Sequence, residues 1–140
     1  MRSLIARPLL SLVMFMACAS AKSPSPVAPA AGLDRPFTLK IGASTSIEAE
    51  KLQIGFDRVI SDSRCPRGAQ CIVAGEAVLR VWLQKSPSAR EHRELTTMPE
   101  GAQAEYGAYR IKLVTLDPYP SVDKAIRPSE YVATFLVTRA

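Results

Sequence analysis

The sequence predicts an all-β fold, an antiparallel β-sandwich of seven or eight strands that is immunoglobulin-like in the broad architectural sense. Apolar and polar residues alternate in several short segments, which is the period of a strand with one buried face. Turn-forming residues separate these segments, and short connections favour antiparallel pairing. After residue 17, no window of about 11 residues has a helical period. A small β-barrel is the alternative arrangement for such a series of strands.

The most apolar segment, residues 77–84, is expected to lie in the middle of a sheet. Val78 and Trp82 make it apolar on the face opposite Leu79, and a strand that is apolar on both faces belongs in a central position. Trp82 is therefore expected to fill the core between the sheets. The predicted strands are 37–41, 44–48, 52–56, 77–84, 91–97, 102–106, 109–115 and 131–137, and one short helical turn is expected within 121–129.

The first 17 residues have the order of a bacterial export signal. Arg2 and Arg7 give a positive start, and an apolar run covers residues 9–16. This run is about half the length of the roughly 18 to 20 residues that a membrane-spanning helix requires. It is therefore expected to be a cleaved targeting segment, which gives a signal peptide of residues 1–17.

Cys18 predicts a lipid anchor. It follows Ala17 in a lipobox-like site, where a small residue precedes the cysteine that is acylated. Ala19, in place of an aspartate, fits sorting to the outer membrane, so we expect an outer-membrane lipoprotein that faces the periplasm and contacts the membrane through its lipid. The alternative is cleavage after Ala21 by the ordinary secretory peptidase, which would give a soluble periplasmic or secreted protein.

Residues 18–34 are expected to form a tether between the lipid and a single folded domain at residues 35–140. Serine, proline and alanine dominate this stretch, and such a composition favours a semi-stiff extended chain that buries no core. A disordered terminus without a tethering role has the same composition. Removing Arg2 and Arg7 with the signal leaves 16 basic against 13 acidic residues, a net charge of +3. This mild excess excludes the strongly basic profile of a nucleic-acid-binding protein.

Cys65 and Cys71 are predicted to form a disulfide. With Cys18 lipidated, they are the two remaining thiols in an oxidising compartment. Pro66 and Gly68 supply the turn chemistry that brings the ends of this loop together. The loop is expected to be a structural staple. Redox exchange and presentation of a ligand-binding loop are the alternatives.

The cysteine loop also carries a motif, D-S-R-C-P, four residues, C, three residues, then G-x-A. It resembles a loop of small bacterial lipoproteins and secreted proteins of unassigned function, which also have an aromatic-led last strand like residues 131–137. This resemblance implies an exported β domain and brings no activity, ligand or catalytic residue. The motif positions are Asp62, Ser63, Arg64, Cys65, Pro66, Cys71, Gly75 and Ala77, and Asp62 is expected to cap the turn or to pair with an adjacent arginine.

No catalytic residue, metal site or cofactor is predicted. The single histidine, His92, is expected to face solvent on a polar strand, although a copper site with Met98 is the alternative. The chain has no phosphate-binding loop, no dinucleotide motif and no nucleophile with a recognisable base. Acidic pairs such as Glu48 and Glu50 are expected on solvated faces. The sequence therefore favours a protein that is not an enzyme.

Three residues are candidates for partner contact. Arg64 and Arg67 flank Cys65, and Tyr119 lies between two prolines on a rigid loop, where it either packs against the end of the domain or forms a recognition tip. Contacts through such loops suit a tethered binding or structural module of the cell envelope, whose partner is an envelope protein or a glycan. The alternative is an inhibitor-like or accessory domain that uses the disulfide loop against a partner protein. The sequence gives no indication of an oligomeric state.

Overall fold

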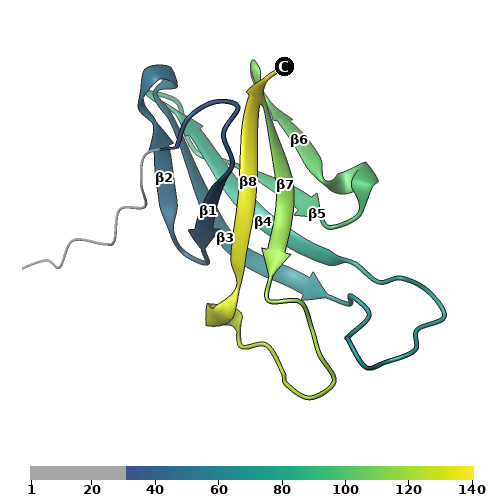
Figure 1. Ribbon diagram of the computed structural model, residues 1–140. Coiled ribbons are helices and arrows are strands. Elements are labelled where there is room, and N and C mark those ends of the chain that lie inside the picture. The colour runs from purple at the N-terminus through teal and green to yellow at the C-terminus, as the bar shows by residue number, and fades with distance from the viewer. Residues whose placement is uncertain (1–30) are drawn as a thin grey trace, which may run out of the picture.

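Two four-stranded antiparallel sheets stack face to face (Figure 1). The computed structural model describes residues 31–140. One sheet has the order β1-β8-β7-β6 and the other has the order β2-β3-β4-β5, which confirms the predicted sandwich of eight strands. The strands are β1 (Phe37–Lys40), β2 (Ser44–Ile47), β3 (Leu52–Asp62), β4 (Ala77–Lys85), β5 (Glu91–Thr96), β6 (Gln103–Tyr106), β7 (Tyr109–Asp117) and β8 (Val132–Arg139).

The strands follow one another in an up-and-down order. β2 to β5 form one meander, β6 to β8 form a second, and β8 pairs with β1. The chain changes sheet only between β1 and β2 and between β5 and β6. The order of strands around the core is therefore that of an up-and-down barrel opened along two seams, and the architecture is a sandwich without Greek-key connections.

The core lies between the two sheets and follows the alternation of the strands. In β4, Leu79, Val81 and Leu83 are completely buried and point to the other sheet. Phe56 on β3 meets Phe135 on β8 edge-on, with ring centroids 5.9 Å apart. This aromatic pair joins the two sheets through the middle of the core.

Trp82 corrects a sequence-based prediction, because it lies on the outer face of β4 and not in the core. Its neighbours in β4, Val81 and Leu83, point inward, so the alternation turns the indole outward. The ring covers Gly55 of β3, where an added Cβ would lie 2.1 Å from the indole, and Arg90 stacks 3.9 Å from the ring centroid. Trp82 therefore packs on the outer surface of its sheet, against Gly55 and Arg90.

The weaker predicted strands are all present as β2, β5 and β6, and β4 lies in the interior of its sheet as expected. β3 runs six residues beyond the predicted segment, to Asp62. The register of β3 against β4 shifts at Asp57 and again at Ile60, so the simple alternation stops where the strand continues. Three short 3₁₀ turns complete the fold, at Glu48–Glu50 (η1), Pro99–Gly101 (η2) and Pro128–Glu130 (η3).

Glu50 is a second correction, since its carboxylate is not freely solvated. Its oxygens accept hydrogen bonds from Tyr109 Oη and Arg139 Nη2, both at 2.5 Å, and Lys85 Nζ donates to the same tyrosine oxygen. The hydrogen bonds from Tyr109 and Arg139 hold the pKa of Glu50 below its ordinary value. The cluster links η1 and β4 of one sheet to β7 and β8 of the other.

The described chain begins in contact with the sandwich. Ala31 and Leu33 pack against the core, and the backbone N–H of Asp34 donates to the carbonyl of Val137 at 2.9 Å. These contacts start just before the predicted domain boundary at residue 35. The predicted signal peptide and Cys18 lie outside the described residues. Within the described range, no helix is long and apolar enough to cross a membrane.

Candidate functional site

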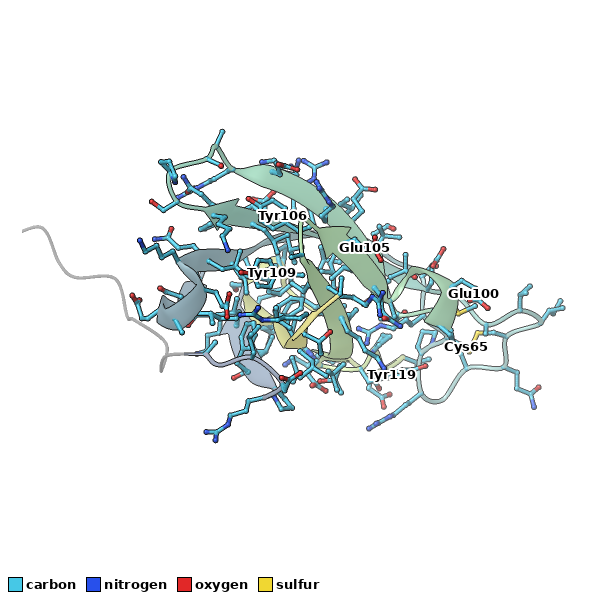
Figure 2. The ribbon with its side chains drawn as sticks, turned by 90° about the horizontal axis from the view of Figure 1, so that it is seen from above. Cys65, Glu100, Glu105, Tyr106, Tyr109 and Tyr119 are labelled. Atoms are coloured by element: carbon cyan, nitrogen blue, oxygen red, sulfur yellow. A yellow bond between two sulfur atoms is a disulfide. The ribbon has the colours of Figure 1, made fainter. Side chains whose placement is uncertain are left out.

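Two long loops meet at one end of the sandwich. The segment 63–76 connects β3 to β4, and the segment 118–131 connects β7 to β8. Backbone hydrogen bonds join Arg67 of the first loop to Pro120 and Val122 of the second, so both loops lie at the same end. Cys65 and Tyr119 lie together there, and the described chain starts at the opposite end of the domain (Figures 1 and 2).

A disulfide closes the first of these loops. Cys65 and Cys71 are bonded, with their Cα atoms 6.0 Å apart, which confirms the predicted bridge. Gly68, inside the closed ring, has a φ of +91°, a conformation that suits glycine. An added Cβ there would also lie 2.8 Å from Val122 of the second loop. The glycine therefore allows the two loops to approach each other closely.

The neck of the disulfide loop is sealed by Ser63 and Glu76. The Ser63 hydroxyl donates to the Glu76 carbonyl at 2.9 Å and accepts from the Glu76 N–H at 3.2 Å. The Ser63 N–H also donates to the Glu76 carbonyl at 2.8 Å. Gly75 fits beside this neck because an added Cβ would lie 1.6 Å from the Ser63 carbonyl oxygen. Ser63 and Gly75 of the D-S-R-C-P motif thus close the loop at its base.

Asp62 and Arg64 form a buried ion pair below the loop. Arg64 Nε donates to Asp62 Oδ1 at 2.8 Å and Arg64 Nη2 donates to Asp62 Oδ2 at 2.7 Å. Tyr131 Oη donates to the same Oδ2 at 3.0 Å, and the Arg64 N–H donates to Oδ1 at 3.2 Å. The predicted pairing of Asp62 with an adjacent arginine is confirmed.

The ionisation of this cluster follows from its contacts. Burial of Asp62 favours its neutral form, but the hydrogen bonds from Arg64 and Tyr131 outweigh burial and hold the pKa of Asp62 below its ordinary value of 3.8. Burial and the bond to Asp62 raise the pKa of Tyr131 to about 12. Asp62 is therefore charged and Tyr131 is neutral across the physiological pH range.

Arg64 joins the two loops and is not exposed to a partner. Its guanidinium also donates to the carbonyls of Leu116 at 2.7 Å and Pro118 at 2.9 Å, and the residue is only 6% exposed. A buried guanidinium with all these partners stabilises the loop end. The expectation that Arg64 contacts a partner therefore loses its basis, since the side chain faces inward.

Arg67 is different, because its backbone is bound and its side chain is exposed. Its N–H donates to the Pro120 carbonyl at 3.0 Å, and its carbonyl accepts from the Val122 N–H at 3.1 Å. The Arg67 guanidinium lies 5.3 Å from the centroid of the Tyr119 ring, and the Arg64 guanidinium lies 5.0 Å from it. Tyr119 thus packs with both arginines while remaining 43% exposed.

Three aliphatic side chains of these loops are exposed. Ile72 is fully exposed, Val73 is 78% exposed, and Val122 of the second loop is 58% exposed. Residues 63–75 contain two charged side chains, Arg64 and Arg67, and the first of them is buried. We call the exposed residues Arg67, Ile72, Val73, Tyr119 and Val122 of the two loops the loop tip.

Two of its residues, Ile72 and Val73, were not among the sequence-based candidates. An apolar pair in a loop indicates a contact surface only when the fold shows that nothing covers it. The feature of the sequence that could have indicated them is their position immediately after Cys71, outside the closed ring and before the next strand.

No family model, curated protein or solved structure matches this chain. The chemistry of the site is therefore inferred from its own residues. In residues 31–140 there is no group of three or more histidine, cysteine, aspartate or glutamate residues placed to hold a metal ion. His92 lies exposed on β5, and both cysteines of the loop are joined. The chemistry that the loop tip offers is apolar contact with one exposed cation beside it.

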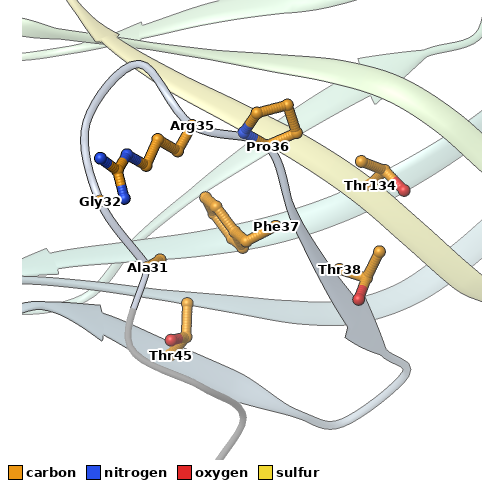
Figure 3. A pocket seen from close by; sticks show the side chains of 8 residues that line it. All are labelled: Ala31, Gly32, Arg35, Pro36, Phe37, Thr38, Thr45 and Thr134. Atoms are coloured by element: carbon orange, nitrogen blue, oxygen red, sulfur yellow. The ribbon is translucent and has the colours of Figure 1, made fainter.

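A separate cavity of about 370 Å³ lies at the seam between β1 and β2. The two strands belong to different sheets, so their edges part, and the segment 31–36 arches over the gap with Phe37 beneath it (Figure 3). Arg35 is the one ionisable side chain in the lining. The cavity therefore offers no acid or base pair. Its lining residues are Ala31, Gly32, Arg35, Pro36, Phe37, Thr38, Thr45 and Thr134.

Proposed function

We propose that this protein is a non-enzymatic module of the bacterial cell envelope that binds a partner through its loop tip. The observation that carries the proposal is an exposed apolar pair on a loop that a disulfide and buried hydrogen bonds hold in place. Ile72 and Val73 are exposed, while Arg64 and the Cys65–Cys71 bridge fix the loop beneath them. Exposed apolar surface on a fixed loop is typical of interaction sites.

The proposal includes a lipid at Cys18, with residues 18–34 as the tether. The loop tip lies at the end of the domain away from the start of the described chain (Figure 2). A domain held by its N-terminus would therefore present the loop tip away from the membrane. The several acyl chains of a bacterial lipoprotein give lasting attachment, which a single chain does not.

Structural contacts support a binding role in preference to catalysis. The buried polar residues at this end, Asp62, Arg64 and Tyr131, satisfy one another and hold the loops. At the other end, Glu50 and Tyr109 do the same between the two sheets. These groups are therefore engaged in maintaining the fold, and the loop tip offers exposed apolar side chains to a partner.

An inhibitor-like or accessory role is the second candidate, and the disulfide loop is the observation that favours it. A protein that inserts a stiffened loop into an enzyme loses little conformational entropy on binding. The backbone of Arg67 is already paired with Pro120 and Val122, so this residue cannot extend its main chain along a protease cleft. An inhibitory contact would therefore use the side chains of residues 69–74.

The anchor is tested by mass spectrometry of the mature N-terminus after expression of the full chain in a bacterial host. The proposal expects an acylated Cys18 in the membrane fraction, and it expects Cys18→Ser to appear in the soluble fraction. An unmodified mature chain that starts at Lys22 would contradict the anchor. The two functional candidates separate on the captured partner, because a hydrolase whose activity falls on binding would favour the inhibitor-like role.

A further inference from the structure

We propose that Ile72 and Val73 enter an apolar pocket on a partner protein, and that Arg67 pairs with a carboxylate at the rim of that pocket. This inference rests on the proposed function and specifies the chemistry of the partner. It commits to a protein surface and not to a glycan or a lipid bilayer.

The aliphatic character of the loop tip argues against a glycan. Proteins commonly hold sugar rings against exposed aromatic faces, and the one aromatic residue of the loop tip is Tyr119. Its ring lies within 5.0 Å of the Arg64 guanidinium and 5.3 Å of the Arg67 guanidinium, measured to the ring centroid. The Tyr119 ring is thus already occupied, and Ile72 and Val73 offer neither stacking nor hydrogen bonds.

The charge around the loop tip argues against an anionic membrane. Membrane-binding surfaces place several lysines or arginines around their apolar residues, because each one near the surface adds attraction to anionic lipids. Here Arg67 is the one exposed cation of the disulfide loop, and the exposed acids nearby are Asp117, the last residue of β7, and Asp123, in the middle of the neighbouring loop. Lys124 and Arg127 both pair with Glu130, at 2.9 and 3.4 Å. Arg67 is thus the one cation of the two loops without an ion-pair partner, and this suits a single carboxylate better than an anionic bilayer surface.

The exposed pair has the features of an interface anchor. Exposed aliphatic side chains contribute to affinity when a complementary pocket removes them from water. Ile72 and Val73 lie between two fixed points of the loop, the Cys65–Cys71 bridge and the Ser63–Glu76 neck. Because both ends of this short segment are fixed, part of its conformational entropy is lost before a partner binds.

The position of Arg67 fits the second part of the proposal. Its main chain is held by Pro120 and Val122, so the base of the side chain is fixed on the second loop, and Arg67 belongs to the same disulfide loop as Ile72 and Val73. The structure shows no carboxylate paired with Arg67 among the ion pairs of residues 31–140. A carboxylate of the partner would pair with the Arg67 guanidinium at the edge of the apolar contact.

The test uses the purified full-length chain, with three separate probes. The first is a detergent-solubilised envelope protein extract of the native cells, the second is vesicles of phosphatidylethanolamine and phosphatidylglycerol, and the third is purified peptidoglycan. The variants are Ile72→Ser with Val73→Ser, and Arg67→Ala. Val114→Ser is the matched control, because Val114 is an exposed aliphatic residue on β7, outside the two loops.

We expect saturable binding of one protein from the extract. The double serine variant should bind about tenfold more weakly or worse, since two aliphatic contacts are lost. Arg67→Ala should weaken binding by about threefold to tenfold, and the difference should shrink in high salt. Val114→Ser should bind as the original chain does. Because the changed residues are exposed, circular dichroism should show an unchanged fold in every variant.

Other results would overturn the inference. Binding to vesicles or to peptidoglycan alone would make the partner a lipid or a glycan, and the proposed binding function would stand. Binding of a protein that is equally strong in the double serine variant would place the contact elsewhere on the domain. If the original chain binds none of the three probes, the proposed function fails together with the inference.

Discussion

Arg64 donates two parallel hydrogen bonds to the carboxylate of Asp62, at 2.8 and 2.7 Å. Further N–H groups of its guanidinium donate to the carbonyls of Leu116 and Pro118. One side chain therefore fastens the disulfide loop to the loop that follows β7. The two loops come from different sheets, so this contact also closes that end of the sandwich. Arg64 thus supports the loop tip together with the disulfide and the backbone bonds of Arg67.

Replacing Arg64 with alanine should destabilise the domain strongly. The change leaves the Asp62 carboxylate buried without its main partner and leaves two carbonyls unsatisfied, which costs about 3 kcal/mol or more. Urea denaturation followed by tryptophan fluorescence measures the effect. The matched control is Arg80→Ala, since Arg80 forms an exposed pair with Glu94 at 3.5 Å and should change the stability by no more than about 0.5 kcal/mol. Equal effects of the two changes would refute the bracing role of Arg64.

Removing the disulfide should lower stability without unfolding the sandwich. A ring closed between Cys65 and Cys71 contributes about 2 to 2.5 kcal/mol in the chain-entropy account. We expect Cys65→Ser with Cys71→Ser to lower Tm by several degrees and to increase amide exchange in residues 63–76. Protection of the strand amides should persist. An unchanged Tm together with unchanged exchange in the loop would show that the bridge does not restrain it.

Gly75 should tolerate no larger residue. An added Cβ would lie 1.6 Å from the backbone oxygen of Ser63, so Gly75→Ala must move the neck of the loop and should cost about 1 to 3 kcal/mol. Gly32→Ala is the control, because the nearest atom to its added Cβ is Arg35 Cδ at 3.8 Å. Thermal unfolding of the two variants measures the difference. Equal stability of Gly75→Ala and Gly32→Ala would show that the neck can move to accept a side chain at residue 75.

Acid should weaken the loop end through Glu130. Hydrogen bonds from Lys124 and from the Arg127 backbone lower the pKa of this carboxyl from 4.5 to about 2. A carboxyl with a lowered folded-state pKa stabilises the protein above its unfolded pKa and loses that effect as pH falls through the folded pKa. Stability should therefore decline between about pH 4.5 and pH 2, and Glu130→Gln should make the decline shallower. The exposed Glu100→Gln serves as control, and an identical pH profile for all three chains would contradict the assignment.

The strands were predictable because the core alternates with period two. Leu79, Val81 and Leu83 show that period in the sequence, and the structure buries all three. The outer face was harder to predict. Trp82 looked like a core residue because a two-sided apolar pattern does not say which face meets the other sheet. Its true position depends on Gly55, which the ladder places directly opposite it on β3.

The candidate site was only partly predictable for a similar reason. Arg64 and Arg67 look alike in the sequence, and only the long-range contacts distinguish them. Arg64 is buried because it reaches carbonyls 52 and 54 residues away, whereas the backbone of Arg67 is held and its side chain stays outside. The disulfide was predictable from the count of cysteines. The exposure of Ile72 and Val73 depends on how the closed loop projects from the domain, which local sequence does not encode.

Photo-crosslinking in living cells tests most directly whether the loop tip is the contact surface. A photoreactive amino acid is placed at residue 73, and in a second chain at residue 114, which is also exposed but lies on β7. We expect one discrete protein adduct from residue 73 after illumination and none from residue 114. An adduct from residue 114 with none from residue 73 would contradict contact through the loop tip, and so would an absence of adducts at both positions.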